Sequence, residues 1–126
     1  MMRVLHAAET IKGGVATVLD SLAIYQKDNE QIAQLNILVP EQHVSELSES
    51  LRPNITPFNR KKRGVLGLIS FATCFYKQVK SHNPNIVHLH STFAGFIGRL
   101  VILAFFRSKN IKIIYCPHGF SFLVHT

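Results

Sequence analysis

The segment from Pro84 to Arg99 constrains the fold most strongly, because it joins a strand, a tight turn and a helix without a linker. Ile86–His90 is a short apolar run ending in histidine, which is typical of a buried strand. Ser91 is a good helix N-cap, and an apolar helical pattern follows it at once. Such a unit favours an open parallel α/β sheet, in which ligands bind where strands end and helices begin.

The rest of the chain repeats this alternation of short apolar runs and helical periodicity. Strands are predicted at residues 3–7, 35–39, 54–58, 86–90 and 111–116, and helices at 15–26, 41–51, 65–82 and 93–106. This order predicts a Rossmann-like, doubly wound α/β fold, a parallel sheet of strand order 3-2-1-4-5 with helices on both faces. Pro53 and Pro57 bracket the third strand, so we expect it at a sheet edge. The whole chain, residues 1–126, is interpreted as one domain.

The composition is that of a folded chain with a sizeable core. Apolar residues make up 47% of its 126 residues and charged residues 17%, which argues against disorder. The aromatic residues of the last predicted helix, Phe93, Phe96, Phe105 and Phe106, are expected in the core. Cys74 and Cys116 are expected to be buried free thiols, as in a reducing cytosol. No leader pattern is expected at the N-terminus, and the most apolar windows are too short to span a bilayer. We therefore expect a cytoplasmic chain, soluble or peripheral to a membrane.

The charge balance favours anionic partners. The chain has 14 Lys and Arg against 7 Asp and Glu, a net charge of +7, which attracts phosphate groups, nucleic acid or an acidic membrane. Arg60, Lys61, Lys62 and Arg63 precede an apolar helix, and this pairing can sit on an anionic membrane surface. The alternative is a solvated loop beside a helix that faces the core. No nucleic-acid-binding motif accompanies the basic run, so no nucleic-acid partner is expected.

Three polar segments follow predicted strands and are expected to line one cleft. Their candidate residues are Gly13, Gly14, His90, Ser91, Thr92, His118 and Gly119. Gly13-Gly14 opens a helix whose free N–H groups could bind an anion. The alternative at this position is a tight turn without a ligand, and the full glycine fingerprint of dinucleotide-binding sites is absent.

Histidines are the other candidates for chemistry. His88 and His90 share one face of a strand, and with His118 they could form a three-histidine metal site. No Asp, Glu or Cys pattern supports such a site, so no metal is expected. His88 is better interpreted as a core histidine with a satisfied hydrogen bond. His90 and His118 stand at strand ends, where binding or catalysis is favoured.

Three motifs, taken in order, resemble the N-terminal half of a family 4, GT-B-fold retaining glycosyltransferase. They are Gly13-Gly14, the segment 85–91 and Tyr115-Cys116-Pro117-His118-Gly119. The resemblance implies synthesis of capsular or other polysaccharides from a nucleotide-sugar, which is a substrate, with no cofactor. It implies that His90, Ser91 and Thr92 bind a glycan or lipid-linked acceptor and that His118 is catalytic at the donor sugar. It also implies that Gly13, Gly14 and Gly119 lie near the donor phosphate. A lipid acceptor would fit the basic segment 60–63.

One departure from the family pattern matters. Such enzymes carry a second Rossmann-like domain with a glutamate pair, and no position after His118 matches that pair. The chain is thus expected to be an incomplete GT-B N-terminal domain that is inactive alone, and a separate chain carrying the second domain is one implied partner. Its last strand is expected at an uncovered edge. Two alternatives are a noncatalytic binding module or remnant of the same fold, and a free-standing nucleotide-binding domain, which the missing glycine fingerprint disfavours.

Overall fold

The computed structural model describes residues 2–8, 14–58, 65–90, 92–107 and 109–115. The strands are β1 (Met2–Ala7), β2 (Ile32–Pro40), β3 (Ile55–Phe58), β4 (Ile86–Leu89) and β5 (Lys112–Tyr115). The α-helices are α1 (Gly14–Lys27), α2 (Val65–His82) and α3 (Thr92–Phe105), and two 3₁₀ helices are η1 (Glu41–Glu46) and η2 (Glu49–Asn54).

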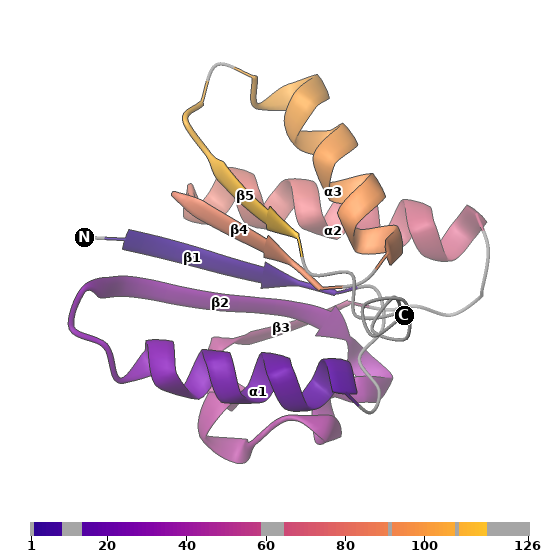
Figure 1. The fold of residues 1–126 in the computed structure, drawn as a ribbon. Coiled ribbons are helices and arrows are strands. Elements are labelled where there is room, and N and C mark those ends of the chain that lie inside the picture. The colour runs from indigo at the N-terminus through magenta and orange to yellow at the C-terminus, as the bar shows by residue number, and fades with distance from the viewer. Residues whose placement is uncertain (1, 9–13, 59–64, 91, 108, 116–126) are drawn as a thin grey trace, which may run out of the picture.

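The strands form one parallel sheet in the order β3-β2-β1-β4-β5 (Figure 1). The predicted doubly wound α/β fold and its strand order are therefore confirmed. β3, with Pro57 inside it, lies at one edge of the sheet, as the prolines predicted. β5 lies at the other edge, and Ile114 on it is 38% exposed.

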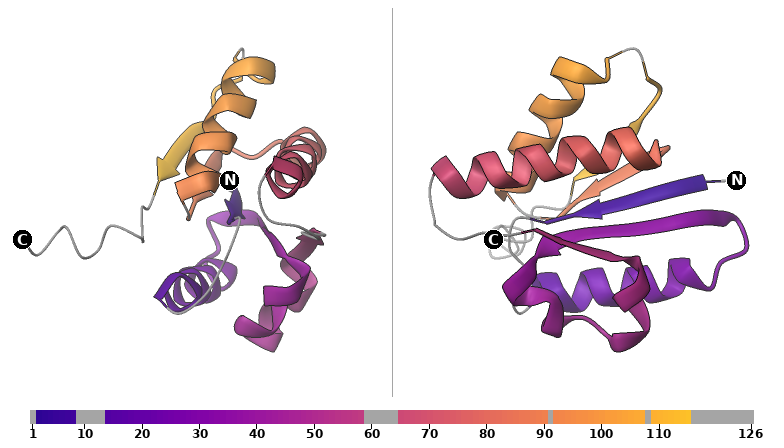
Figure 2. Two further views of the ribbon diagram at one scale, coloured as in Figure 1. Left: turned by 90° about the vertical axis from the view of Figure 1, so that its right-hand side faces the viewer. Right: turned by 180° about the vertical axis from the view of Figure 1, so that it is seen from behind.

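Helices cover both faces of the sheet, and each face has its own apolar cluster (Figure 2). One cluster packs α2 and α3 against alternate strand residues such as Leu5, Leu38 and Leu89. The other packs α1, η1 and η2 against the opposite set, which includes Val4 and Ile37. This separation follows from the two-residue period of a strand, since successive side chains point to opposite faces.

The predicted helix over residues 41–51 is wrong, because the chain forms η1 and η2 there with a break between them. At the break, Ser48 donates its backbone N–H to Asp20 Oδ1 (2.7 Å) and its hydroxyl to Asp20 Oδ2 (2.8 Å). That N–H is therefore unavailable to a continuing helix. Leu47, at the break, and Leu51 on η2 both enter the core beneath α1.

The junction between α2 and β4 sets β4 beside β1. Asn83 adopts a left-handed φ of 47° and donates its N–H to the carbonyl of Val79 (2.9 Å), which ends the helix. Pro84 follows and cannot continue a helix. The Asn85 N–H then donates to the Arg3 carbonyl (2.8 Å), and Asn85 Oδ1 accepts from the Arg3 N–H (2.9 Å). These bonds fix the register of the central pair of strands.

The expected burial of the α3 aromatic residues holds only in part. Phe106, which directly follows the helix, is 5% exposed, but Phe96 is 62% and Phe105 is 66% exposed. The Phe93 side chain lies outside the described part of the structure. The helix is apolar around most of its circumference, yet only the stripe that faces β4 and α2 can be covered by them. The exposed stripe is a feature of the surface rather than of the core.

Two further expectations concern the thiols and the membrane. Cys74 on α2 is a free thiol, as predicted, but it is partly exposed rather than fully buried; partial burial raises its pKa. Cys116 lies outside the described residues. Over those same residues, none of the helices combines the length and the apolarity required to cross a bilayer.

Candidate functional site

The described part of the predicted ligand edge lies where the strands end. α1 begins at Gly14 and α3 at Thr92, both on the side of the sheet to which the strand arrows point (Figure 1). His90 follows β4 directly and donates its backbone N–H to the carbonyl of Ala7 at the end of β1 (3.0 Å). The structure thus places Gly14, His90 and Thr92 at one edge, as expected from a parallel sheet.

The other predicted site residues cannot be placed. Gly13, Ser91, His118, Gly119 and the basic run Arg60, Lys61, Lys62 and Arg63 lie outside the described residues. The prediction that all the polar segments line one cleft therefore stays a prediction.

Below this edge, three histidines gather on the face of the sheet that carries α1. His6 on β1 is the register partner of His88 on β4, and His90 lies two residues further along. The ring centroids are 5.1 Å apart for His6 and His88, 5.0 Å for His6 and His90, and 4.1 Å for the stacked pair His88 and His90. His6 and His90 are fully buried and His88 is 6% exposed. We call these three residues the histidine cluster.

Hydrogen bonds to Gln26 on α1 and to His90 fix the protonation of His6. Its Nε2 lies 2.5 Å from Gln26 Oε1, and its Nδ1 lies 2.8 Å from His90 Nε2. Because an amide oxygen only accepts, His6 Nε2 carries the proton, and His6 Nδ1 accepts the hydrogen of His90 Nε2. Burial lowers the pKa of His6 from 6.5 to about 4, against a raising effect of the Gln26 bond, and His88 lowers it further. His6 is thus a neutral imidazole with its Nδ1 lone pair directed into the cluster.

Sequence reasoning missed His6 and misjudged the surroundings of His90. The predicted strand order places the first and fourth strands side by side, so a histidine in the first strand was the available signal. His88 is buried with an interaction partner, which confirms its interpretation as a core histidine. The ring of His90 does not face an open cleft, because it packs on the rings of His6 and His88. Its role in acceptor binding stays a prediction.

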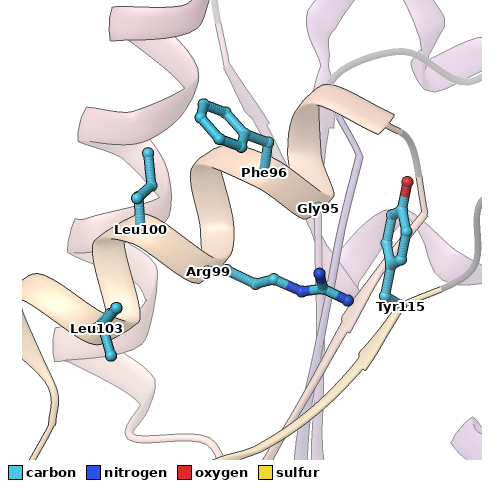
Figure 3. A pocket seen from close by; sticks show the side chains of 6 residues that line it. All are labelled: Gly95, Phe96, Arg99, Leu100, Leu103 and Tyr115. Carbon is cyan, nitrogen blue, oxygen red and sulfur yellow. The ribbon is translucent and has the colours of Figure 1, made fainter.

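A pocket of about 380 Å³ lies between α3 and the edge strand β5, beside the carboxyl edge of the sheet (Figure 3). Its lining comprises Gly95, Phe96, Arg99, Leu100, Leu103 and Tyr115. The guanidinium carbon of Arg99 lies 4.7 Å from the centre of the Tyr115 ring, a cation–π contact. The pocket therefore combines apolar walls with one cation, which sequence reasoning had not assigned to a site.

Two glycines let α3 approach the sheet closely enough to form this pocket. A Cβ on Gly95 would overlap the Tyr115 ring, and a Cβ on Gly98 would lie 2.8 Å from Leu89 Cδ2. Larger residues at these positions would push the helix away from β4 and β5.

The chain is similar in sequence to a curated protein and in structure to solved proteins. The chain is 38% identical over 126 residues to an uncharacterized 41.2 kDa protein in the cps region of Klebsiella pneumoniae. The match covers 99% of this chain and 33% of that protein. The chain thus spans about a third of the length of this curated relative.

Solved structures share the fold at low sequence identity. The lipopolysaccharide outer core galactosyltransferase WaaB, in its apo form, matches with a TM-score of 0.68 and 15% identity, over 93% of this chain and 33% of that chain. A putative UDP-N-acetylglucosamine 2-epimerase from Listeria monocytogenes matches with a TM-score of 0.59 and 14% identity, over 91% of this chain and 31% of that one. The family model for Glycosyltransferase Family 4 matches residues 12–125. Since this match takes in nearly the whole sequence and the sheet has the expected order, the chain belongs to glycosyltransferase family 4.

Proposed function

We propose that this chain forms the acceptor side of a retaining glycosyltransferase that moves a sugar from a nucleotide-sugar to a glycan or lipid-linked acceptor. The observation that carries the proposal is the family 4 match over residues 12–125, on a parallel sheet whose helices α1 and α3 begin at one edge. The relative encoded in a cps region favours polysaccharide biosynthesis as the process.

On the donor side, the proposal rests on the start of α1. The N-terminus of a helix offers backbone N–H groups and a partial positive charge to a phosphate. Gly14 is the first residue of α1, and no side chain of its own blocks a ligand there. Gly13 and Gly119 are proposed to complete the phosphate contacts and His118 to act at the donor sugar, as the family resemblance implies.

On the acceptor side, the pocket between α3 and β5 supports a lipid-linked acceptor. Phe96, Leu100 and Leu103 are 62%, 48% and 64% exposed, and their positions in α3 repeat every three to four residues on one side of the helix. We call these three residues the α3 apolar face, and Figure 3 shows them along the rim of the pocket. Arg99 within α3 and Arg107 just after its end are exposed cations on the same segment of the chain. Apolar side chains flanked by cations suit the interface of an anionic membrane, where such an acceptor resides.

The basic segment 60–63 is proposed to contribute to the same membrane contact, each cation adding about 1 kcal/mol near an anionic surface. The chain would then work at the cytoplasmic face of the cell membrane. Because family members hold most of the nucleotide-sugar in a second domain, we infer that the 126 residues alone transfer no sugar. Positioning of donor against acceptor supplies much of the rate, and one wall of a cleft cannot provide it.

The proposal is tested with a chimera in which these 126 residues replace the matching third of the Klebsiella relative. Transfer of radiolabelled sugar from common nucleotide-sugars to a lipid extract is measured for the chimera, the intact relative and the isolated chain. We expect transfer by the first two and none by the third, and loss of transfer on His118→Ala. A folded but inactive chimera beside an active relative would favour the noncatalytic binding module instead. Turnover by the isolated chain would show that it holds a complete active site.

A further inference from the structure

We propose that His6, His88 and His90 bind one divalent transition-metal ion of the Zn²⁺ type, through one imidazole nitrogen from each residue. One ring nitrogen from each of the three lies within 4.8 Å of the other two, and all three residues are buried. The ligands come from two hydrogen-bonded strands, with His6 and His88 as register partners. The backbone therefore holds the three rings together before any ion arrives.

The spacing of the nitrogens suits a tetrahedral ion. With metal–nitrogen bonds of about 2.0–2.1 Å, two nitrogens on a tetrahedral ion lie about 3.3 Å apart. His6 Nδ1 and His90 Nε2 are 2.8 Å apart, and the widest pair in the cluster is within 4.8 Å. The observed separations bracket the required one, so small rotations of the imidazole rings are sufficient.

Gln26 on α1 supplies the outer contact that metal-binding histidines use. Its Oε1 accepts from His6 Nε2, which leaves His6 Nδ1 as the nitrogen directed at the other two rings. A hydrogen bond to the far nitrogen of a ligand fixes both its tautomer and its orientation. In this respect His6 already has the arrangement of a bound ligand.

Binding requires the proton on His90 Nε2 to move. Without a metal, the hydrogen on His90 Nε2 lies between that atom and His6 Nδ1. When the ion binds, His90 takes the tautomer with hydrogen on Nδ1, and the lone pairs of both nitrogens coordinate the metal. Each imidazole stays neutral, so no proton is released and the ion keeps its charge of two.

The ligand set also selects the ion. Three imidazole nitrogens suit Zn²⁺, Co²⁺, Ni²⁺ and Cu²⁺, whereas Mg²⁺ and Ca²⁺ prefer oxygen ligands. The sequence had suggested His118 as the third partner of His88 and His90; the structure brings His6 to them, and His118 lies outside the described residues. An ion at this position would tie β1 to β4 directly beneath the edge where α1 and α3 begin.

The test uses the 126-residue chain, purified without a metal-affinity tag and stripped with a chelator. Zn²⁺ is titrated in competition with a chromophoric chelator, and Co²⁺ is added separately to record its visible spectrum. We expect one ion per chain and the intense visible bands of tetrahedral Co²⁺. His88→Gln and His90→Gln should each weaken binding at least about tenfold, because an amide is a poor ligand for these ions. His43→Gln on η1 is the matched control and should change nothing.

Variants of Gln26 separate metal binding from a purely structural role of the cluster. Gln26→Leu should weaken Zn²⁺ binding about 10- to 100-fold without removing a ligand, and Gln26→Glu, which still accepts the bond from His6, should retain it. These variants decide the matter if the histidine variants fail to fold. Absence of stoichiometric binding by the wild-type chain, with its folding verified by circular dichroism, would overturn the proposal. Equal affinity in the wild type and in folded His88→Gln would overturn it as well.

Discussion

Removing the α3 apolar face should greatly weaken binding to anionic vesicles. The change is the triple substitution Phe96→Ser, Leu100→Ser and Leu103→Ser. Full burial of a Phe or Leu side chain contributes about 1.5–3 kcal/mol, and these three are 62%, 48% and 64% exposed. Their exposed parts together would contribute about 3 kcal/mol on entering the membrane interface, which corresponds to roughly 100-fold in the partition coefficient.

Sedimentation with vesicles of neutral or anionic lipid measures this effect. The matched control is Val18→Ser, Ile24→Ser and Tyr25→Ser on α1, which removes three exposed apolar side chains from the opposite face of the sheet. The control should bind as the wild type does, and added salt should weaken wild-type binding by screening the cations. If the α3 triple variant binds as well as the control, α3 does not contact the membrane.

Three further predictions test the packing of α3, the histidine cluster and the basic segment. Gly98→Ala should destabilise the chain by about 1 kcal/mol in urea unfolding, because crowding against Leu89 outweighs the gain in helix propensity; unchanged or higher stability would contradict the close packing. In metal-free buffer, the free energy of unfolding should fall by up to about 3 kcal/mol as pH falls from 6.5 to 4, because His6 has a pKa near 6.5 in the unfolded chain and about 4 in the folded one. The same loss of stability over this pH range in His6→Asn as in the wild type would refute this. Replacing Arg60, Lys61, Lys62 and Arg63 by Gln should lower binding to anionic vesicles more, per charge removed, than Lys27→Gln on α1 with Arg52→Gln on η2; equal losses per charge would remove the basic segment from the membrane contact.

Local patterns predicted the sheet well. The apolar runs placed four of the five strands to within a residue or two at each end, and β2 begins earlier than expected, at Ile32. The helical periods placed α1, α2 and α3 similarly well. The helix over residues 41–51 failed because its outcome depends on a distant partner. Asp20 on α1 accepts the backbone N–H of Ser48, which a continuous helix would need, and the Ser48 hydroxyl as well.

The candidate site was less predictable than the fold. Gly14, His90 and Thr92 could be assigned to one edge because every parallel strand ends there. The histidine cluster was not found, because His6 lies 84 residues from His90 in sequence and meets it only through strand pairing. The pocket beside Arg99 and Tyr115 was hidden for a similar reason, since one wall comes from α3 and the other from β5.

The sequence by itself determined the alternation of strands and helices, the parallel sheet with its order, and the resemblance that the family match confirmed. These follow from local periodicity and from short motifs, which each segment carries independently of the others. Only the tertiary structure decided that His6 joins His88 and His90, and that Phe96 faces outward while Phe106 is buried. Burial depends on which neighbours a side chain meets, and a helix apolar on most sides, such as α3, does not encode which of its stripes the sheet will cover.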